Sequence, residues 1–111
     1  MSANKARGTR WESAIVAFLA ERGWLNAERR ALHGTNDLGD VVGIPGVVIE
    51  AKSQARHSLA EWLDEAETER QNAGARIGVA WFKRRGHTSP SKGYVLMDGS
   101  TFTYLLKEAG Y

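Results

Sequence analysis

The sequence places a carboxylate and an ammonium two residues apart, in Glu50-Ala51-Lys52, at the end of an apolar run. In a β-strand such residues share one face, and their Cα atoms lie roughly 6.6 Å apart. We expect Glu50 and Lys52 to point to one side with Val48, while Ile49 and Ala51 face apolar packing. A solvated pair on an edge strand would explain this pattern, but on a central strand both charges need partners or a metal ion.

A second carboxylate, Asp40, stands shortly before Glu50, and the turn pair Pro45-Gly46 lies between them. The turn separates two β-branched runs, which predicts a hairpin. Because one strand of a hairpin starts where the other ends, we expect Asp40 to lie near Glu50. Two carboxylates and a backbone carbonyl form an oxygen-only site that suits Mg²⁺ or Mn²⁺. Asp40 could instead be a turn residue after Gly39.

Two further acidic residues are candidates for the same site. Glu12 falls on the apolar side of a predicted helix, and it also ends Thr9-Arg10-Trp11-Glu12, which has the form of a capping box. The two roles can coexist. Asp37 is the rival of Asp40, but its neighbours are typical of a turn. We prefer Asp40 because it leads directly into the strand.

The elements that must position these residues follow from hydrophobic periodicity and from turn residues. Helices are predicted from about Arg10 to Arg22, from a capping box at Ser58 to Gly74, and from a cap at Ser100 to near Gly110. Strands are predicted at 27–32, 41–44, 47–51, 77–82 and 94–97, with a loop at 33–37. The order α-β-β-β-α-β-β-α predicts an α/β fold in which one mixed central sheet is flanked by helices.

The length of 111 residues fits one domain, with residues 1–8 as a basic N-terminal arm and residues 9–111 as a single domain. The absence of cysteine excludes disulfides and thiolate metal sites, and the three histidines lack the spacing of a zinc site. No segment approaches the ~18 apolar residues of a membrane span, and the N-terminus lacks the apolar run of a signal peptide. We therefore expect a cytoplasmic protein without a membrane partner.

The segment from Gly39 to Lys52, GDVVGIPGVVIEAK, resembles the core of the PD-(D/E)XK nucleases. In that pattern an acidic residue, a hairpin and Asp/Glu-x-Lys follow one another, and Gly39 stands where a proline is usual. The helix with Glu12, the Gly34-Thr35 loop and the length narrow the resemblance to archaeal-type Holliday junction resolvases, including small ones encoded by bacteriophages. The resemblance covers residues 8–106 and implies a restriction-endonuclease-like α-β-β-β-α-β core.

The resemblance implies a metal-dependent DNA endonuclease with Glu12, Asp40, Glu50 and Lys52 as catalytic residues. Asp40, Glu50 and the Ala51 backbone carbonyl would hold Mg²⁺, for which Mn²⁺ substitutes, and Glu12 would bind a second ion or its water. Lys52 would orient the attacking water, and beside two carboxylates it should stay protonated. The metal would make water more acidic and offset charge on the phosphate. The expected products carry a 5′-phosphate and a 3′-hydroxyl.

Basic residues supply a second indication that the protein binds DNA, since clusters of Lys and Arg can follow a phosphate backbone. The run Lys83-Arg84-Arg85 opens a loop after a predicted strand. The other candidate DNA contacts lie near the arm or the 33–37 loop: Arg7, Arg10, Arg30 and Thr35. Thr35 is included because it resembles a hydroxyl residue in the corresponding loop of the family. Any one of these residues could instead be a solvated surface group.

Together with these basic residues, the resemblance implies a structure-specific Holliday junction resolvase that acts as a homodimer on four-way or branched DNA. Two matched cuts need two active sites related by a two-fold axis, which a homodimer provides. Two alternatives stay open: another nuclease of the superfamily, of the flap, duplex-end or restriction-like type, or a catalytically inactive DNA-binding relative. The presence of Asp40, Glu50 and Lys52 argues against the inactive relative.

Overall fold

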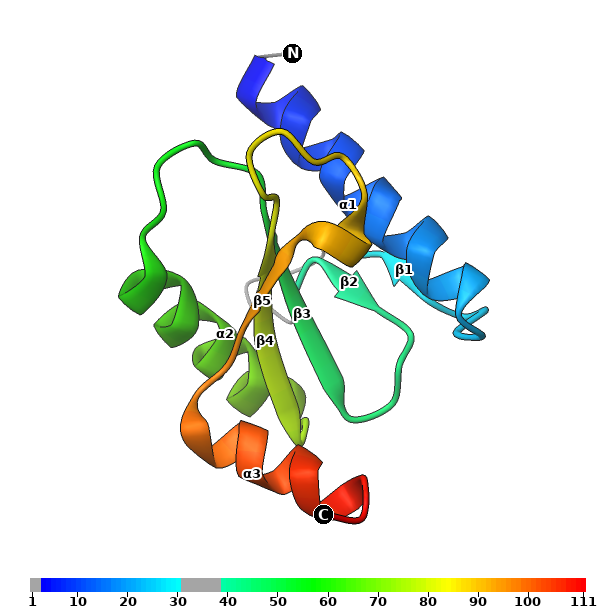
Figure 1. The fold of residues 1–111 in the computed structure, drawn as a ribbon, viewed down its shortest axis with the longest axis vertical. Helices are drawn as coiled ribbons and strands as arrows, with labels where there is room; N and C mark the ends of the chain where they lie inside the picture. The colour runs from blue at the N-terminus through cyan, green and yellow to red at the C-terminus, as the bar shows by residue number, and fades with distance from the viewer. Residues whose placement is uncertain (1–2, 31–38) are drawn as a thin grey trace.

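A computed structural model describes residues 3–30 and 39–111, which form three α-helices, a 3-10 helix and one five-stranded mixed sheet (Figure 1). In chain order the elements are α1 (Ala3–Glu21), β1 (Glu28–Arg29), β2 (Val41–Val42), β3 (Val47–Lys52), α2 (Leu59–Ala73), β4 (Ile77–Phe82), η1 (Pro90–Lys92), β5 (Tyr94–Leu96) and α3 (Gly99–Glu108). The predicted order of helices and strands is confirmed, and η1 is an addition to it.

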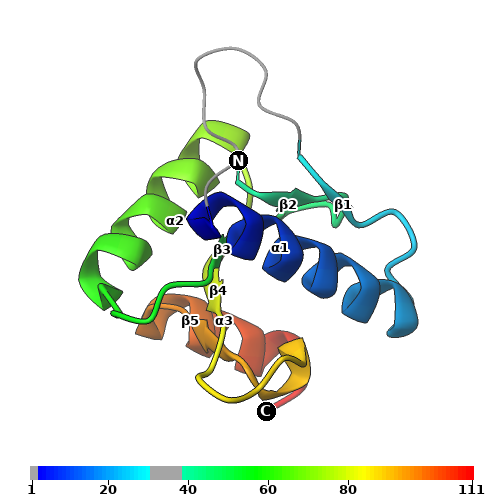
Figure 2. The same cartoon turned by 90° about the horizontal axis from the view of Figure 1, so that it is seen from above.

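The strands lie in the order β1-β2-β3-β4-β5, with β3 and β4 parallel and every other pair antiparallel. The parallel pair follows from the α2 crossover, because a tight turn can join only antiparallel neighbours. α1 and α2 lie on opposite faces of the sheet (Figure 2). α3 lies at the end where β4 begins and β5 ends (Figure 1). The expectation of a mixed sheet flanked by helices is therefore confirmed.

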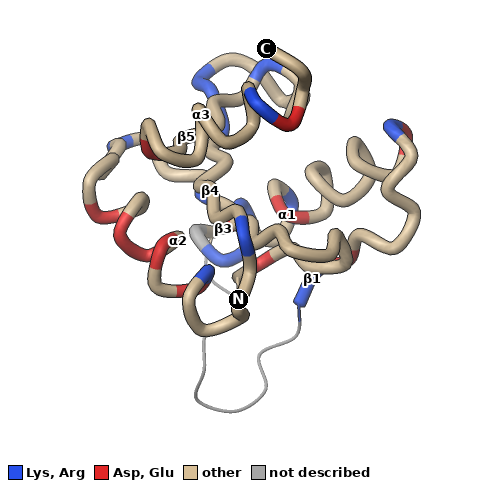
Figure 3. Tube along the Cα trace, turned by 90° about the horizontal axis from the view of Figure 1, so that it is seen from below, with Lys and Arg blue, Asp and Glu red and all other residues tan. Residues whose placement is uncertain are grey.

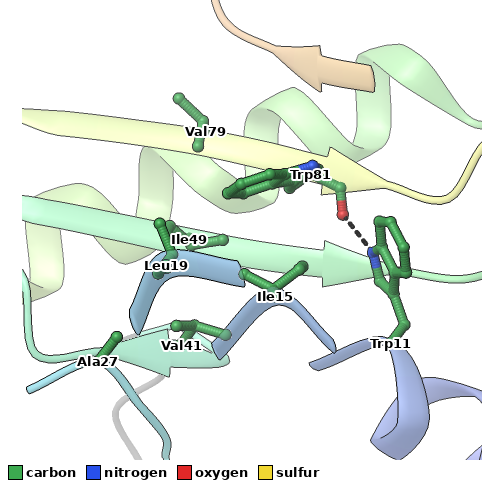
Figure 4. Close-up of a cluster of buried hydrophobic side chains, with 8 residues drawn as sticks. All are labelled: Trp11, Ile15, Leu19, Ala27, Val41, Ile49, Val79 and Trp81. Atoms are coloured by element: carbon green, nitrogen blue, oxygen red, sulfur yellow. Dashed lines mark hydrogen bonds between the residues drawn. The ribbon is translucent and has the colours of Figure 1, made fainter. Parts of the chain in front are cut away.

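The larger core lies between α1 and the sheet, and Figure 4 shows its buried members: Trp11, Ile15, Leu19, Ala27, Val41, Ile49, Val79 and Trp81. The α1 residues recur at helical spacing, and those of the strands at the alternation of a sheet face. The indole N–H of Trp11 donates to the Trp81 carbonyl oxygen at 2.9 Å, which satisfies a donor that burial takes away from water. This core ties α1 to the sheet.

The hairpin between β2 and β3 forms as its turn residues predict. The Val47 N–H donates to the Ile44 carbonyl oxygen at 3.1 Å, and Gly46 has a φ of +79°. Proline first and a left-handed glycine second make a type II turn. Val41 lies opposite Ile49, so the residue before β2 is brought to the C-terminal half of β3.

α2 packs closely on the other face because β4 carries no side chain at Gly78. A Cβ there would lie 2.8 Å from the Ala66 carbonyl oxygen, so a larger residue would push the helix away. At the C-terminus of α2, Gly74 has a left-handed φ of +63°, and its N–H donates to carbonyls of the last turn. The predicted end of this helix is confirmed.

Two predicted helix starts need correction, those of α1 and α3, whereas the start of α2 after Ser58 is confirmed. α1 begins at Ala3 rather than near Arg10, so residues 3–8 are helical, and Thr9 cannot cap a helix that it lies inside. The good helix formers before Gly8 outweigh its cost of about 1 kcal/mol. Asp98, not Ser100, caps α3, since its Oδ1 accepts the Thr101 N–H at 2.8 Å. Ser58 does precede α2, but its side chain makes no capping hydrogen bond.

Two predicted strands are shorter than expected. Of the described residues 27–30, Glu28–Arg29 form the first of these strands, and residues 31–32 of its predicted range lie outside the described part of the chain. The strand expected at 41–44 is formed by Val41–Val42. Gly43 ends β2 with a φ of +104°, which lies outside the β region.

The 33–37 loop, with Thr35 and Asp37, lies outside the described residues. No helix of residues 3–30 and 39–111 is long and apolar enough to cross a membrane.

Candidate active site

The predicted site residues gather where the parallel strands β3 and β4 end, beside the N-terminal half of α1 (Figure 1). The ladder of backbone hydrogen bonds ends there, so the side chains that follow can separate and leave space between them. Ligands of open α/β sheets commonly bind at this edge. A hollow of about 480 Å³ lies at this place, lined by Arg7, Gly8, Glu12, Asp40, Ala51, Lys52, Ser53, Gln54 and Ala55.

The Asp40 carboxylate is held against the end of β3. Its Oδ2 accepts the Ala51 N–H at 2.8 Å, and its own N–H donates to the Ile49 carbonyl oxygen at 2.9 Å. Burial and the neighbouring charge of Glu50 raise the pKa of Asp40 from 3.8 to about 7. The hairpin therefore brings the two carboxylates together, as its turn predicted, and their mutual repulsion favours a cation between them.

Gly39 is required at its position for a physical reason. Its φ is +99°, which proline cannot adopt because its ring fixes φ near −65°. A Cβ on Gly39 would also lie 2.8 Å from Cγ1 of the buried Val48 side chain. Glycine is the residue that lets the chain approach β3 this closely and place Asp40.

Glu50 lies on a central strand and is 6% exposed, so the alternative of a solvated pair on an edge strand is wrong. Its Oε1 lies 3.3 Å from Lys52 Nζ. Its Oε2 is buried. When the neighbouring Asp40 carboxyl is ionised, this oxygen has no hydrogen-bond donor among the described residues. Leaving such an oxygen unpaired is costly, and a bound cation would remove that cost.

The Lys52 ammonium points to the α2 side of the sheet, where its Nζ lies 2.7 Å from Glu65 Oε2. Burial lowers the pKa of Lys52, but the hydrogen bond to Glu65 and the charges of Glu50 and Glu65 outweigh burial and hold the pKa above its usual value. These contacts favour the positive charge that is expected on Lys52. Its ion pair with Glu65 was not expected.

Glu12 reaches the same hollow from α1, where its Oε1 accepts a hydrogen bond from Arg29 Nε at 3.0 Å. The capping alternative for Glu12 is wrong because the helix begins well before it. The structure therefore brings Glu12, Asp40 and Lys52 to one hollow, with Arg29 as the partner that orients Glu12.

Four of the predicted DNA-contacting basic residues line hollows beside the site, and the others do not. Arg7 and Lys83 line two adjoining hollows of about 340 and 300 Å³; Arg10 joins them in the first and Arg85 in the second. Arg84 points elsewhere, with its guanidinium carbon 5.9 Å from the centre of the Tyr94 ring. Arg30 donates its backbone N–H to the Asp40 carbonyl oxygen at 2.9 Å. Thr35 lies outside the described residues.

Two acidic residues of α2, Glu65 and Glu69, escaped the sequence reasoning. One carboxylate oxygen from each lies within 4.8 Å of the other and of a Glu50 oxygen. The buried residues of α2 are Trp62, Ala66 and Glu69, which follow one helix face. An acidic residue in an otherwise apolar stripe is a signal that was present in the sequence.

Comparisons with protein-family models, with curated proteins and with solved structures find no match to this chain.

Proposed function

We propose that the chain is a divalent-metal-dependent DNA endonuclease of the PD-(D/E)XK superfamily, and most specifically a Holliday junction resolvase. The observation that carries this proposal is the pairing of Asp40 and Glu50 at the end of a buried central strand, with a charged Lys52 beside them. The order α1-β1-β2-β3-α2-β4 supports the restriction-endonuclease-like core, since an antiparallel hairpin leads through a helix to a parallel strand.

The donor set fits Mg²⁺ or Mn²⁺. Asp40, Glu50 and the Ala51 carbonyl are hard oxygen donors, and the repulsion between the two carboxylates, which helps to raise the pKa of Asp40, favours a cation. When bound, a divalent ion supplies Lewis-acid stabilisation of charge on a phosphate. Glu12 lines the same hollow as a further oxygen donor.

The residues of the chain have distinct tasks in this proposal. Lys52 keeps a positive charge at the wall of the hollow, where it would stabilise a phosphate oxygen and orient the attacking water. Arg7 and Lys83, which line the adjoining hollows, would hold phosphates on either side of the scissile bond. Cleavage would leave a 5′-phosphate and a 3′-hydroxyl.

The substrate is proposed to be four-way or branched DNA, cut by a homodimer in the cytoplasm. Two subunits related by a two-fold axis would present two sites to the two continuous strands of a junction. A flap nuclease, a duplex-end or restriction-like nuclease, and a binding protein without activity are the alternative outcomes of the test below.

The test incubates the protein and Mg²⁺ with a four-way junction, a flap and a plain duplex built from the same arms, and maps the cuts on each strand. Asp40→Asn, Glu50→Gln and Lys52→Ala should each reduce cleavage by orders of magnitude while binding survives. Glu108→Gln, on exposed α3, serves as the matched control. Ca²⁺ should support binding without cutting, because it accepts looser geometry.

Three results would overturn parts of the proposal. Wild-type cleavage by Glu50→Gln would show that the site is misassigned, and full activity in excess chelator would remove the metal from the mechanism. A monomer in sedimentation, with and without DNA, would exclude the resolvase and favour a simpler nuclease.

A further inference from the structure

α2 carries most of its charge as carboxylates, and Figure 3 shows acidic residues gathering along this helix. They are Glu61, Asp64, Glu65, Glu67 and Glu69. Glu69 differs from the others because it is 1% exposed and lies under the helix with Trp62. Taking a carboxylate out of water is costly unless a cation or strong hydrogen bonds compensate, so this position calls for an explanation beyond solubility.

The buried face of α2 brings Glu65 and Glu69 to Glu50 on β3. One oxygen of each of the three carboxylates lies within 4.8 Å of the others. Lys52 Nζ already lies between two of them, 3.3 Å from Glu50 Oε1 and 2.7 Å from Glu65 Oε2. One ammonium therefore faces two of the three carboxylates, and the cluster holds a cation even in the ion-free protein.

A second observation points to a ligand of higher charge. The Glu50 side chain is 8% exposed, and its buried Oε2 has no donor among the described residues when its neighbours are ionised. An ion could also reach the cluster from solvent, because a hollow of about 530 Å³ runs along α2, lined by Glu61, Asp64, Glu65, Thr68 and Glu69. This hollow is separate from the one that contains Asp40 and Glu12.

We propose that Glu50, Glu65 and Glu69 form a second divalent-cation site, in which the ion replaces the Lys52 ammonium. Three carboxylates make an oxygen-only set that selects hard ions such as Mg²⁺, Mn²⁺ or Ca²⁺. Entry of the ion separates Lys52 from Glu65 and leaves the ammonium free to turn toward the hollow that contains Asp40, of which Lys52 is a lining residue. This site concerns cation binding and does not rest on the proposed nuclease activity.

The experiment titrates the full chain with Mn²⁺ and follows bound ion by electron paramagnetic resonance and by calorimetry. Wild type should bind two ions, one at Asp40 and one at α2. Glu65→Gln or Glu69→Gln should remove the α2 ion and keep the other, while Asp40→Asn should do the reverse. Lys52→Met should tighten the α2 site by about tenfold or more, since it removes a competing cation from a partly buried pair.

Glu61→Gln is the matched control, because Glu61 lines the same hollow outside the cluster. Circular dichroism checks that each variant is folded, and if Glu69→Gln fails to fold, Glu65→Gln carries the test because Glu65 is 37% exposed. Unchanged Mn²⁺ binding in Glu65→Gln, or unchanged affinity in Lys52→Met, would overturn the second site. A single ion lost in Glu65→Gln but kept in Asp40→Asn would support it and refute the metal assignment of the proposed function.

Discussion

Replacing Asp40 by asparagine should stabilise the ion-free protein at alkaline pH, although it removes a residue of the proposed active site. In the folded chain, burial and the charge of Glu50 raise the pKa of Asp40 from 3.8 to about 7. The folded state therefore holds a proton that the unfolded chain has already released, and the free energy of unfolding falls as pH rises from about 4 to above 7. Asparagine keeps an oxygen that can accept the Ala51 N–H but carries no charge.

The size of the effect follows from the same pKa values. A difference of about three pH units at ~1.36 kcal/mol each sets an upper limit of about 4 kcal/mol. Because Asp40 is not fully buried and shares its proton equilibrium with Glu50, we expect about 2–4 kcal/mol at pH 8 and little difference at pH 4.

The assay is urea unfolding of wild type and Asp40→Asn in a chelator at several pH values between 4 and 8.5. Asp64→Asn, an exposed carboxylate on α2, is the control and should show a constant offset. Adding Mn²⁺ should then stabilise wild type more than Asp40→Asn, because ligand binding to the folded state adds to its stability. A stability difference that does not grow with pH, or a variant less stable than wild type at pH 8, would refute the reasoning.

Three further predictions follow from single contacts. Lys52→Met should lower the free energy of unfolding by about 2–4 kcal/mol in urea titrations without metal, because it leaves one buried and one half-buried carboxylate without their cation. Gly39→Ala should cost more than Gly46→Ala, about 2–4 against about 1 kcal/mol, since both have positive φ but only Gly39 is crowded; equal thermal-melt shifts would contradict this. Lys83→Ala should reduce the salt slope of DNA binding by about 0.9 in fluorescence anisotropy, whereas Arg84→Ala should change it less, and the reverse order would show that the hollows are not the phosphate path.

Local signals account for what could be predicted about the fold. The Pro45-Gly46 turn and the β-branched runs beside it specify a hairpin through backbone preferences that act within a few residues. The stripe of α1 and the alternation of β3 specify their buried faces in the same local way. The wrong helix starts have a local cause too. The capping-box pattern at Thr9 lies inside α1, and Asp98 and Ser100 are both residue types that can cap a helix.

The candidate site could be predicted only in part. The hairpin is a short-range contact, so the meeting of Asp40 and Glu50 could be inferred from the turn between them. Glu65 and Glu69 meet Glu50 through a long-range contact, which depends on how α2 crosses over the sheet and on the space that Gly78 leaves for it. No local sequence pattern predicts how closely α2 packs against the sheet.

The sequence by itself determined the order of elements, the register of the hairpin and the face of β3 on which Glu50 and Lys52 lie, because each depends on neighbours close in the chain. Only the tertiary structure decided which element covers that face and what the two charges touch there. Lys52 pairs with Glu65 as well as with Glu50. It does so because α2 excludes water from that face of the sheet and supplies a second carboxylate, whose Oε2 lies 2.7 Å from Lys52 Nζ. The strength of a charge pair depends on the burial around it, and burial is set by parts of the chain that are distant in sequence.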